Sequence, residues 1–170
     1  ILHHIVKAVQ GFPWIALCGS SPRGLPANVY ADLCHHLQAN RHKVCVDTRD
    51  QWLSKAVMAH PYLIKCNQHE AQRVLRCTIS TVEQARDAAQ VWTDLGINRV
   101  VITLGDQGAV AVHKDNAWHV TAPKVKALSP VGSGDALMAG LLFRLAQGAS
   151  LSSATQYGLA LGAANTLELG

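Results

Sequence analysis

The sequence predicts an α/β fold with a mostly parallel sheet, and three observations support this prediction. Short apolar runs of strand length alternate with segments in which apolar residues recur at helical spacing. The runs are nearly free of polar residues, which is typical of strands covered on both faces in parallel sheets. Towards the C-terminus, the alternation is replaced by a hairpin and two longer helices, an order that favours an α/β architecture.

Composition limits the class of protein. With 170 residues, 49% of them hydrophobic and 15% charged, we expect residues 1–170 to form a single globular domain. The net charge of +4 is scattered and aromatic residues make up only 5%, which argues against a nucleic-acid partner. No apolar run is long enough for a membrane span, and the nine histidines show no metal-ligand spacing.

The cysteines indicate a reducing compartment. They are odd in number and form no C-x-x-C pair, so we expect reduced thiols in the core of a cytoplasmic protein. The residues concerned are Cys18, Cys34, Cys45, Cys66 and Cys77.

The first half of the chain is predicted to contain three strands, each followed by a helix. After the end of a helix over 1–10, the run 12–18 is apolar throughout and is expected to be buried on both faces. It ends in a loop rich in turn residues, and Pro26 suits the first position of the helix that follows. The remaining elements are a strand over 44–48, a short helix over 52–58, a strand over 62–65 and a helix over 67–76 with Asn67 near its cap.

The second half begins with a well-delimited helix over 81–95. Ser80 or Thr81 caps it, and Gly96 ends it. The run 99–104 is the clearest buried strand of the chain. The elements that follow are a tight turn at 105–108, strands at 109–113 and 117–121 around a turn at 114–116, and helices from about 133 to 147 and from 150 to 168.

Polar loops follow four of the predicted strands. In sheets of this type, ligands bind beyond the carboxyl ends of the strands, so these loops are expected to meet at one edge. More polar residues gather there than helix capping requires, which predicts a binding site. The loops are 19–26, 47–48, 65–70 and 103–108.

The segment 130–136 places glycines and an aspartate at the start of an apolar helix. Unpaired N–H groups and the positive end of the helix dipole attract anions there, phosphate above all. Asp135 adds a base, and an anion site with a base suggests phosphoryl transfer to an alcohol. Taken alone, Asp135 is explained more simply as a helix cap or dipole partner; the converging loops favour the functional interpretation.

Four segments occur together, in this order, in one known family. They are G-S-S-P-R-G-L-P at 19–26, K-C-N-Q-H-E at 65–70, T-L-G-D-Q-G-A at 103–109 and P-V-G-S-G-D-A-L-M-A-G at 130–140. The chain from residue 12 to 170 therefore resembles the PfkB/ribokinase family of carbohydrate kinases, in particular its phosphosugar branch of 1-phosphofructokinases and tagatose-6-phosphate kinases. This resemblance implies a ribokinase-like three-layer α/β/α fold.

The resemblance also implies an activity: ATP-dependent phosphorylation of fructose 1-phosphate or tagatose 6-phosphate to a bisphosphate, with Mg²⁺. Asp135 would accept the proton of the attacking hydroxyl. The amides of Gly132, Ser133 and Gly134 would stabilise the charge on the phosphoryl oxygens. Members of the family have small-molecule partners, ATP and the phosphosugar, and a homodimer is expected for the full-length protein.

The other loops receive roles by the same resemblance. Asn67 would contact the nucleotide and Glu70 would hold Mg²⁺; without the resemblance, a simple N-cap for Asn67 and a surface residue for Glu70 would be favoured. Ser20 and Arg23 would bind the sugar phosphate, unless Arg23 is a solvated loop residue. One wall of the nucleotide site, otherwise an ordinary turn, would be formed by Thr103, Gly105, Asp106 and Gly108.

The chain departs from the family pattern in three respects. Ser21 replaces a leucine, and Cys66 replaces a proline. Family members are nearly twice as long, so the N-terminal strands, the lid and the residues that grip the sugar are expected to be missing from this stretch. The alternative function is therefore a truncated nucleotide-binding or interaction module without turnover.

Overall fold

The computed structural model describes residues 2–22 and 24–168, and its centre is one six-stranded sheet. The strands lie side by side in sequence order, parallel from β1 to β4 and antiparallel from β4 to β6. The predicted α/β class with a mostly parallel sheet is thus confirmed. The strands are β1 (Trp14–Cys18), β2 (Lys43–Asp47), β3 (Leu63–Asn67), β4 (Arg99–Thr103), β5 (Ala109–His113) and β6 (Asn116–Val120).

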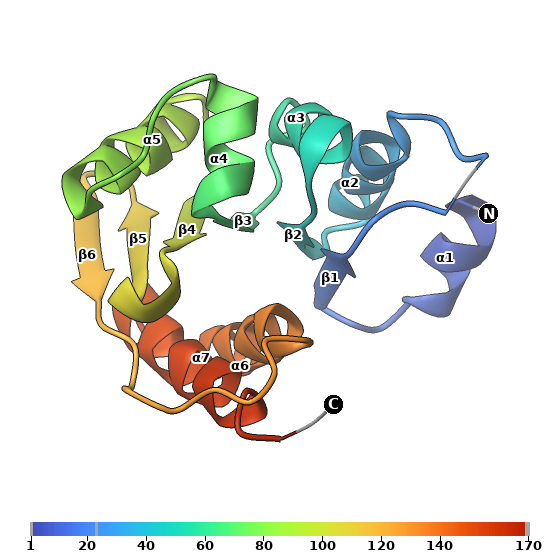
Figure 1. The fold of residues 1–170 in the computed structure, drawn as a ribbon. Coiled ribbons are helices and arrows are strands. Elements are labelled where there is room, and N and C mark those ends of the chain that lie inside the picture. The colour runs from blue at the N-terminus through green and yellow to red at the C-terminus, as the bar shows by residue number, and fades with distance from the viewer. Residues whose placement is uncertain (1, 23, 169–170) are drawn as a thin grey trace.

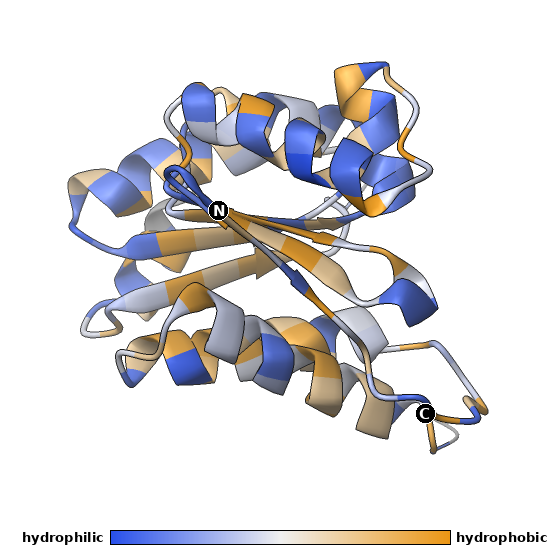
Figure 2. Cartoon of the chain, turned by 90° about the vertical axis from the view of Figure 1, so that its left-hand side faces the viewer, coloured by the Kyte–Doolittle hydropathy of each residue, from blue (hydrophilic) through white to orange (hydrophobic). Residues whose placement is uncertain are grey.

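Helices cover the sheet in two layers (Figure 1). One face carries the helices between residues 29 and 94 in an arc, with the N-terminal helix beside the first of them, and the other face carries the C-terminal pair. Apolar residues run along the strands between the layers (Figure 2). No helix in the described part of the chain is long and apolar enough to cross a membrane. The helices are α1 (Leu2–Ala8), α2 (Val29–Ala39), α3 (Asp50–Val57), α4 (Gln68–Leu75), α5 (Val82–Asp94), α6 (Ser133–Ala146) and α7 (Leu151–Asn165), with a 3₁₀ turn at Gly105–Gln107.

The predicted elements all form, and the largest boundary differences are at the start of α2 and at the end of α7, which was expected at 168 and lies at Asn165. The helix α2 begins at Val29 rather than at Pro26, because the amide of Val29 donates to the Pro26 carbonyl in a turn that precedes it. Tyr30, the second residue of the helix, donates its hydroxyl hydrogen to the carbonyl of Gly19 at 2.8 Å. This hydrogen bond therefore connects the start of α2 to the loop that follows β1.

The strand β1 corrects two predictions. It was expected to be buried on both faces, but Ile15 packs beneath α2 while Ala16 and Cys18, on the other face, are exposed. β1 lies at the edge of the sheet, where α6 covers this face only in part and leaves a groove between the two elements. Cys18 is therefore not a core residue, and neither is the exposed Cys77; the other three cysteines are buried, and all five are free.

Glycines bring α6 and α7 into close contact. A Cβ on Gly158 would lie 2.7 Å from the Leu137 carbonyl oxygen, and one on Gly140 would lie 2.7 Å from a methyl carbon of Leu161. This contact brings Asn165, at the end of α7, next to the turn before α6, where its amide nitrogen donates to the Val131 carbonyl at 2.8 Å. The turn before α6 is thus held in place by the end of α7.

Candidate active site

The four predicted loops meet at the carboxyl ends of the strands, around two adjoining clefts. The first, which we name the β4 cleft, has a volume of about 570 Å³ and lies between the turn after β4 and the start of α6. The second, the β2 cleft, has a volume of about 350 Å³ and lies beyond the ends of β2 and β3. Two residues, Lys65 and Gly134, line both clefts.

The start of α6 presents open backbone donors. Gly132 precedes the helix with φ 80°, in the left-handed region that glycine adopts without strain. The Ser133 amide donates to the Pro130 carbonyl at 3.3 Å, and the Ser133 hydroxyl donates to the same oxygen at 2.8 Å. The amides of Gly132, Gly134 and Asp135 make no hydrogen bond with residues that the structure describes. The open donors are thus the two glycine amides and the amide of Asp135, because that of Ser133 is engaged.

Asp135 lies in the first turn of α6 with its carboxylate exposed. The carboxylate accepts no hydrogen bond from any described residue, and the helix has no side-chain cap. Asp135 therefore does not cap the helix, while its place in the first turn agrees with the other simple explanation, an interaction with the helix dipole. It lines the β2 cleft.

Cys18 and Asp47 are close neighbours of Asp135. One side-chain sulfur or oxygen atom from each of the three residues lies within 4.8 Å of the others. Burial, and after it the charges of Asp47 and Asp135, raise the pKa of Cys18 to about 11, so that the thiol stays protonated at neutral pH. A neutral thiol beside Asp135 adds no negative charge to this end of the sheet.

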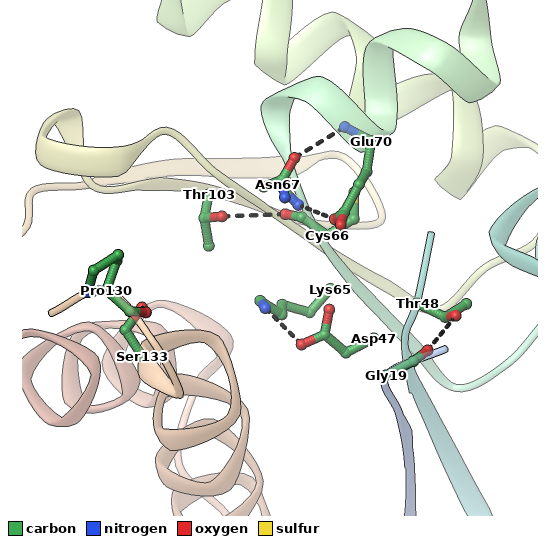
Figure 3. A network of polar contacts seen from close by, with 10 residues as sticks. All are labelled: Gly19, Asp47, Thr48, Lys65, Cys66, Asn67, Glu70, Thr103, Pro130 and Ser133. Atoms are coloured by element: carbon green, nitrogen blue, oxygen red, sulfur yellow. Dashed lines mark hydrogen bonds and ion pairs between the residues drawn. The ribbon is translucent and has the colours of Figure 1, made fainter. Parts of the chain in front are cut away.

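A buried ion pair at the centre of the site was not singled out from the sequence. The Lys65 ammonium lies 2.6 Å from a carboxylate oxygen of Asp47, with 7% and 12% of the two side chains exposed (Figure 3). Burial raises the pKa of Asp47, and the attraction of Lys65 opposes this rise. The signal available in the sequence was a lysine inside the otherwise apolar run 63–66, since a buried charge needs a partner.

Asn67 and Glu70 form a capping box at the start of α4 (Figure 3). The Asn67 side-chain oxygen accepts from the Glu70 amide at 2.9 Å, and the Glu70 carboxylate accepts from the Asn67 amide at 2.8 Å. The N-cap role considered for Asn67 is confirmed, while Glu70 is half-buried rather than on the surface. Both residues line the β2 cleft, and only one Glu70 oxygen takes part in the box. A single carboxylate with a free oxygen suits Mg²⁺, which keeps much of its water shell.

The turn after β4 forms a wall of the β4 cleft. Thr103, Gly105, Asp106 and Gly108 all line this cleft. Gly108 has φ 93°, and a Cβ there would lie 2.0 Å from the Val120 carbonyl oxygen, so the turn packs against the end of β6. The four residues are therefore brought together by a rigid turn.

Of the two residues expected to bind the sugar phosphate, the structure describes one. Ser20 lines the β2 cleft together with Asp135. Arg23 lies outside the described residues. The β2 cleft instead contains Arg49, which the sequence analysis did not consider.

Comparisons with known proteins agree with this arrangement. The model of the pfkB family of carbohydrate kinases matches residues 2–170. A 1-phosphofructokinase from Rhodobacter capsulatus is 33% identical over 161 residues, which are 95% of this chain and 51% of the relative. The ATP-dependent 6-phosphofructokinase isozyme 2 of Escherichia coli is 33% identical over 171 residues, which are 99% of this chain and 55% of the relative.

Solved structures show the same fold. Phosphofructokinase-2 from Escherichia coli, crystallised with potassium, superimposes with a TM-score of 0.91 and 30% identity, covering 99% of this chain and 56% of that one. The same enzyme is known in complex with substrates and products and in a tetrameric inhibited form. The chain spans about half the length of the curated relatives it matches.

Proposed function

The chain belongs to the pfkB family of carbohydrate kinases, and on this basis we propose that it carries the phosphoryl-transfer site of an ATP-dependent phosphosugar kinase. The acceptor in this proposal is fructose 1-phosphate or tagatose 6-phosphate, and the product is a bisphosphate. One observation supports it above the others: the unbonded carboxylate of Asp135 stands beside the open amides of Gly132 and Gly134, where two clefts meet. We propose turnover for the complete protein that contains residues 1–170. These residues are proposed to form a single domain.

In the proposed mechanism, ATP occupies the β4 cleft with its phosphates towards the start of α6. Thr103, Gly105, Asp106 and Gly108 form the wall against the nucleotide. The acceptor sugar enters through the β2 cleft, where Ser20 is available for its phosphate. This arrangement brings the hydroxyl and the γ-phosphate together from opposite sides, as an in-line transfer requires.

Asp135 would take the proton of the sugar hydroxyl as the oxygen attacks. The amides at the start of α6 would meanwhile donate to the phosphoryl oxygens, on which negative charge is carried in the transition state. Because these donors are fixed by the helix, no reorganisation is needed when the charge develops. The glycines allow the phosphoryl group to approach the backbone closely.

Glu70 is the residue that would hold Mg²⁺, through the carboxylate oxygen outside the capping box. Bound there, Mg²⁺ supplies positive charge to the phosphates of the nucleotide. Asn67 keeps Glu70 in position through their reciprocal hydrogen bonds and would contact the nucleotide phosphates. A cytoplasmic location is supported by the five free cysteines; assembly as a homodimer remains a prediction from the resemblance.

A second function is favoured by the exposed face of β1. Residues 1–170 on their own would then be a nucleotide-binding module without turnover, because a groove of about 310 Å³ between β1 and α6 stays open beside Asp135. In this case the β4 cleft would bind ATP, but no sugar would be held against Asp135.

A coupled ADP-release assay, combined with calorimetric ATP binding, separates the two functions. We expect ADP release with fructose 1-phosphate or tagatose 6-phosphate and much less with unphosphorylated fructose and tagatose. ATP binding without ADP release on any sugar would support the binding module. Failure to bind ATP at all would contradict both.

A further inference from the structure

Arg49 lies at the β2 cleft, two residues beyond the end of β2. It lines this cleft together with Ser20 and Asp135, and it is not among the described residues that line the β4 cleft. The residue is exposed, so its charge is open to solvent and to ligands. Arg49 is therefore a cation on the acceptor side of the proposed site.

Two hydrogen bonds hold the end of β2 against the loop that follows β1. The Gly19 amide donates to the Asp47 carbonyl at 2.9 Å, and the Thr48 hydroxyl donates to the Gly19 carbonyl at 2.6 Å (Figure 3). Thr48 is buried, and a hydrogen bond is stronger where water is excluded. Ser20 and Arg49 are the next residues along these two segments. The fold thus brings a hydroxyl and a guanidinium to the same cleft from adjoining segments.

The charge of Arg49 is not compensated by the part of the chain that the structure describes, in which no carboxylate lies within ion-pair distance of it. The adjacent carboxylate, Asp50, is paired with Arg73 of α4 at 2.9 Å instead. Asp47 and Glu70, which line the same cleft, are engaged in an ion pair and in the capping box. The five N–H donors of the guanidinium are thus available to an acceptor from outside the chain.

The backbone next to Arg49 is strained. Asp50, the first residue of α3, has φ 54°, in the left-handed region that a residue with a side chain adopts only at a cost in free energy. The ion pair with Arg73 connects this residue to α4, the helix that begins at the capping box. Strain of this kind persists where the surrounding structure imposes it, and it is frequent at functional sites. The contacts of Asp50 therefore fix the chain directly after Arg49.

A solvated surface side chain is the simpler explanation for an exposed arginine. A phosphate group explains more of the arrangement, because a planar guanidinium donates to two phosphate oxygens at once and the Ser20 hydroxyl provides a further donor. The phosphoryl group in transfer enters from the β4 cleft in the proposed mechanism, and Arg49 does not line that cleft. The phosphate that remains is the one that the acceptor sugar already carries.

We propose that Arg49 is a specificity-determining residue, whose guanidinium binds the phosphate that the acceptor sugar already carries. This inference rests on the proposed function. The sugar lies across the β2 cleft, with its free hydroxyl at Asp135 and its phosphate at Arg49 and Ser20. Arg49 transfers no proton and does not contact the group in transfer. Its contact is the same before and during the reaction, so its loss affects KM more than kcat.

The experiment compares acceptors in the complete protein that contains residues 1–170. A coupled ADP-release assay gives kcat and KM for fructose 1-phosphate, tagatose 6-phosphate and ATP, and kcat/KM for unphosphorylated fructose and tagatose. We expect Arg49→Gln to lower kcat/KM for the phosphorylated sugars on the order of 10- to 100-fold, as for the loss of a charged hydrogen bond, and mainly through KM. The KM for ATP and the kcat/KM for the unphosphorylated sugars should not change.

Two further variants make the comparison specific. Arg49→Lys keeps the charge but loses the planar arrangement of donors, so it should recover only part of the loss. Arg86→Gln is the matched control, because Arg86 is also an exposed arginine and lies on α5, next to its partner Asp87. Its kinetic constants should equal those of the wild type. Thermal unfolding of each variant accompanies the assays, and because Arg49 is exposed, its replacement should leave the melting temperature unchanged.

The outcomes separate this inference from the proposed function. A folded Arg49→Gln variant with the wild-type KM for both phosphorylated sugars overturns the inference alone. The same holds if the KM for ATP rises equally, if Arg86→Gln shows the same loss, or if the melting temperature of Arg49→Gln falls clearly, which would indicate a structural role. If the wild-type protein releases no ADP with any of the sugars, the proposed function is overturned and this inference with it.

Discussion

The two halves of the sheet differ in how fully they are covered. β3, β4 and β5 are buried on both faces, and the β4 cleft beside them is closed by a rigid turn and by α6. β1 has one open face, and the groove between it and α6 is lined mostly by apolar residues, together with Asp135. Phe143, on the same helix, is 55% exposed.

This difference separates two requirements of a kinase. The nucleotide side needs a rigid wall and fixed donors, and the chain provides both around β4 and α6. The acceptor side needs residues that hold a sugar against Asp135, and there the chain offers Ser20, Arg49 and an open groove. The carboxylate of Asp135 lies between the covered part of the sheet around β4 and the open face of β1.

The largest effect is expected for Asp135→Asn. Removing a positioned base should lower kcat about 10²–10⁴-fold in the complete protein. Nucleotide affinity should stay within a few-fold of the wild type, because the β4 cleft does not include this side chain. A coupled ADP-release assay gives the first quantity and calorimetry the second. Full activity of the variant would remove Asp135 from the mechanism.

Two substitutions compare a buried with an exposed position of α6 by their effect on the free energy of unfolding. Leu141 is fully buried, so Leu141→Ala should cost about 2–5 kcal/mol of unfolding free energy. Phe143→Ala should cost about 1 kcal/mol or less, since it loses mainly a stacking contact with Tyr157. Urea denaturation measures both. Equal losses would mean that the exposed Phe143 is packed as well as the buried Leu141.

Two glycines with positive φ provide a finer comparison. Gly108→Ala in the turn after β4 combines backbone strain with a Cβ 2.0 Å from the Val120 carbonyl oxygen, so we expect a loss of about 1–3 kcal/mol or more. Gly19→Ala, after β1, has φ 84° and no heavy atom within 4 Å of the added Cβ. It should show the strain alone, about 1 kcal/mol. Chemical denaturation measures both losses. A larger loss of unfolding free energy for Gly19→Ala than for Gly108→Ala would contradict the expected difference between the two turns.

The smallest effect concerns alkylation of Cys18. The thiolate is the reactive form, and a pKa near 11 keeps it scarce at neutral pH despite the exposure of the residue. The rate of labelling by iodoacetamide should therefore rise about tenfold for each pH unit between 7 and 9. Asp135→Asn should accelerate it, because the charge of Asp135 contributes to the raised pKa. Mass spectrometry of the labelled peptide measures the rate; a pH-independent rate would contradict the assignment.

Local patterns in the sequence were sufficient for most of the fold. Apolar runs and helical periodicity predicted every element, and cap residues such as Thr81 and Ser150 predicted where helices start. The open face of β1 was not predictable, because an apolar run has the same composition whether or not a helix covers it. The start of α2 was misjudged because Pro26 suits a turn as well as a first helical position.

The candidate site was likewise predictable only in part. The motifs led to Asp135, Glu70 and the turn after β4, which the fold brings to the two clefts. The ion pair of Asp47 and Lys65 escaped notice because it joins neighbouring strands and no local motif contains both residues. The hydrogen bond of the Ser133 amide was not predictable either, because it depends on how the chain turns at Pro130.

The most direct test of the account is a crystal structure of the protein with ADP, Mg²⁺ and aluminium fluoride, which mimics the phosphoryl group in transfer. We predict ADP in the β4 cleft and the fluoride at the start of α6, about 3 Å from the Gly134 amide. A nucleotide bound elsewhere, or phosphates directed away from α6, would contradict the central claim that this helix start is the site of phosphoryl transfer.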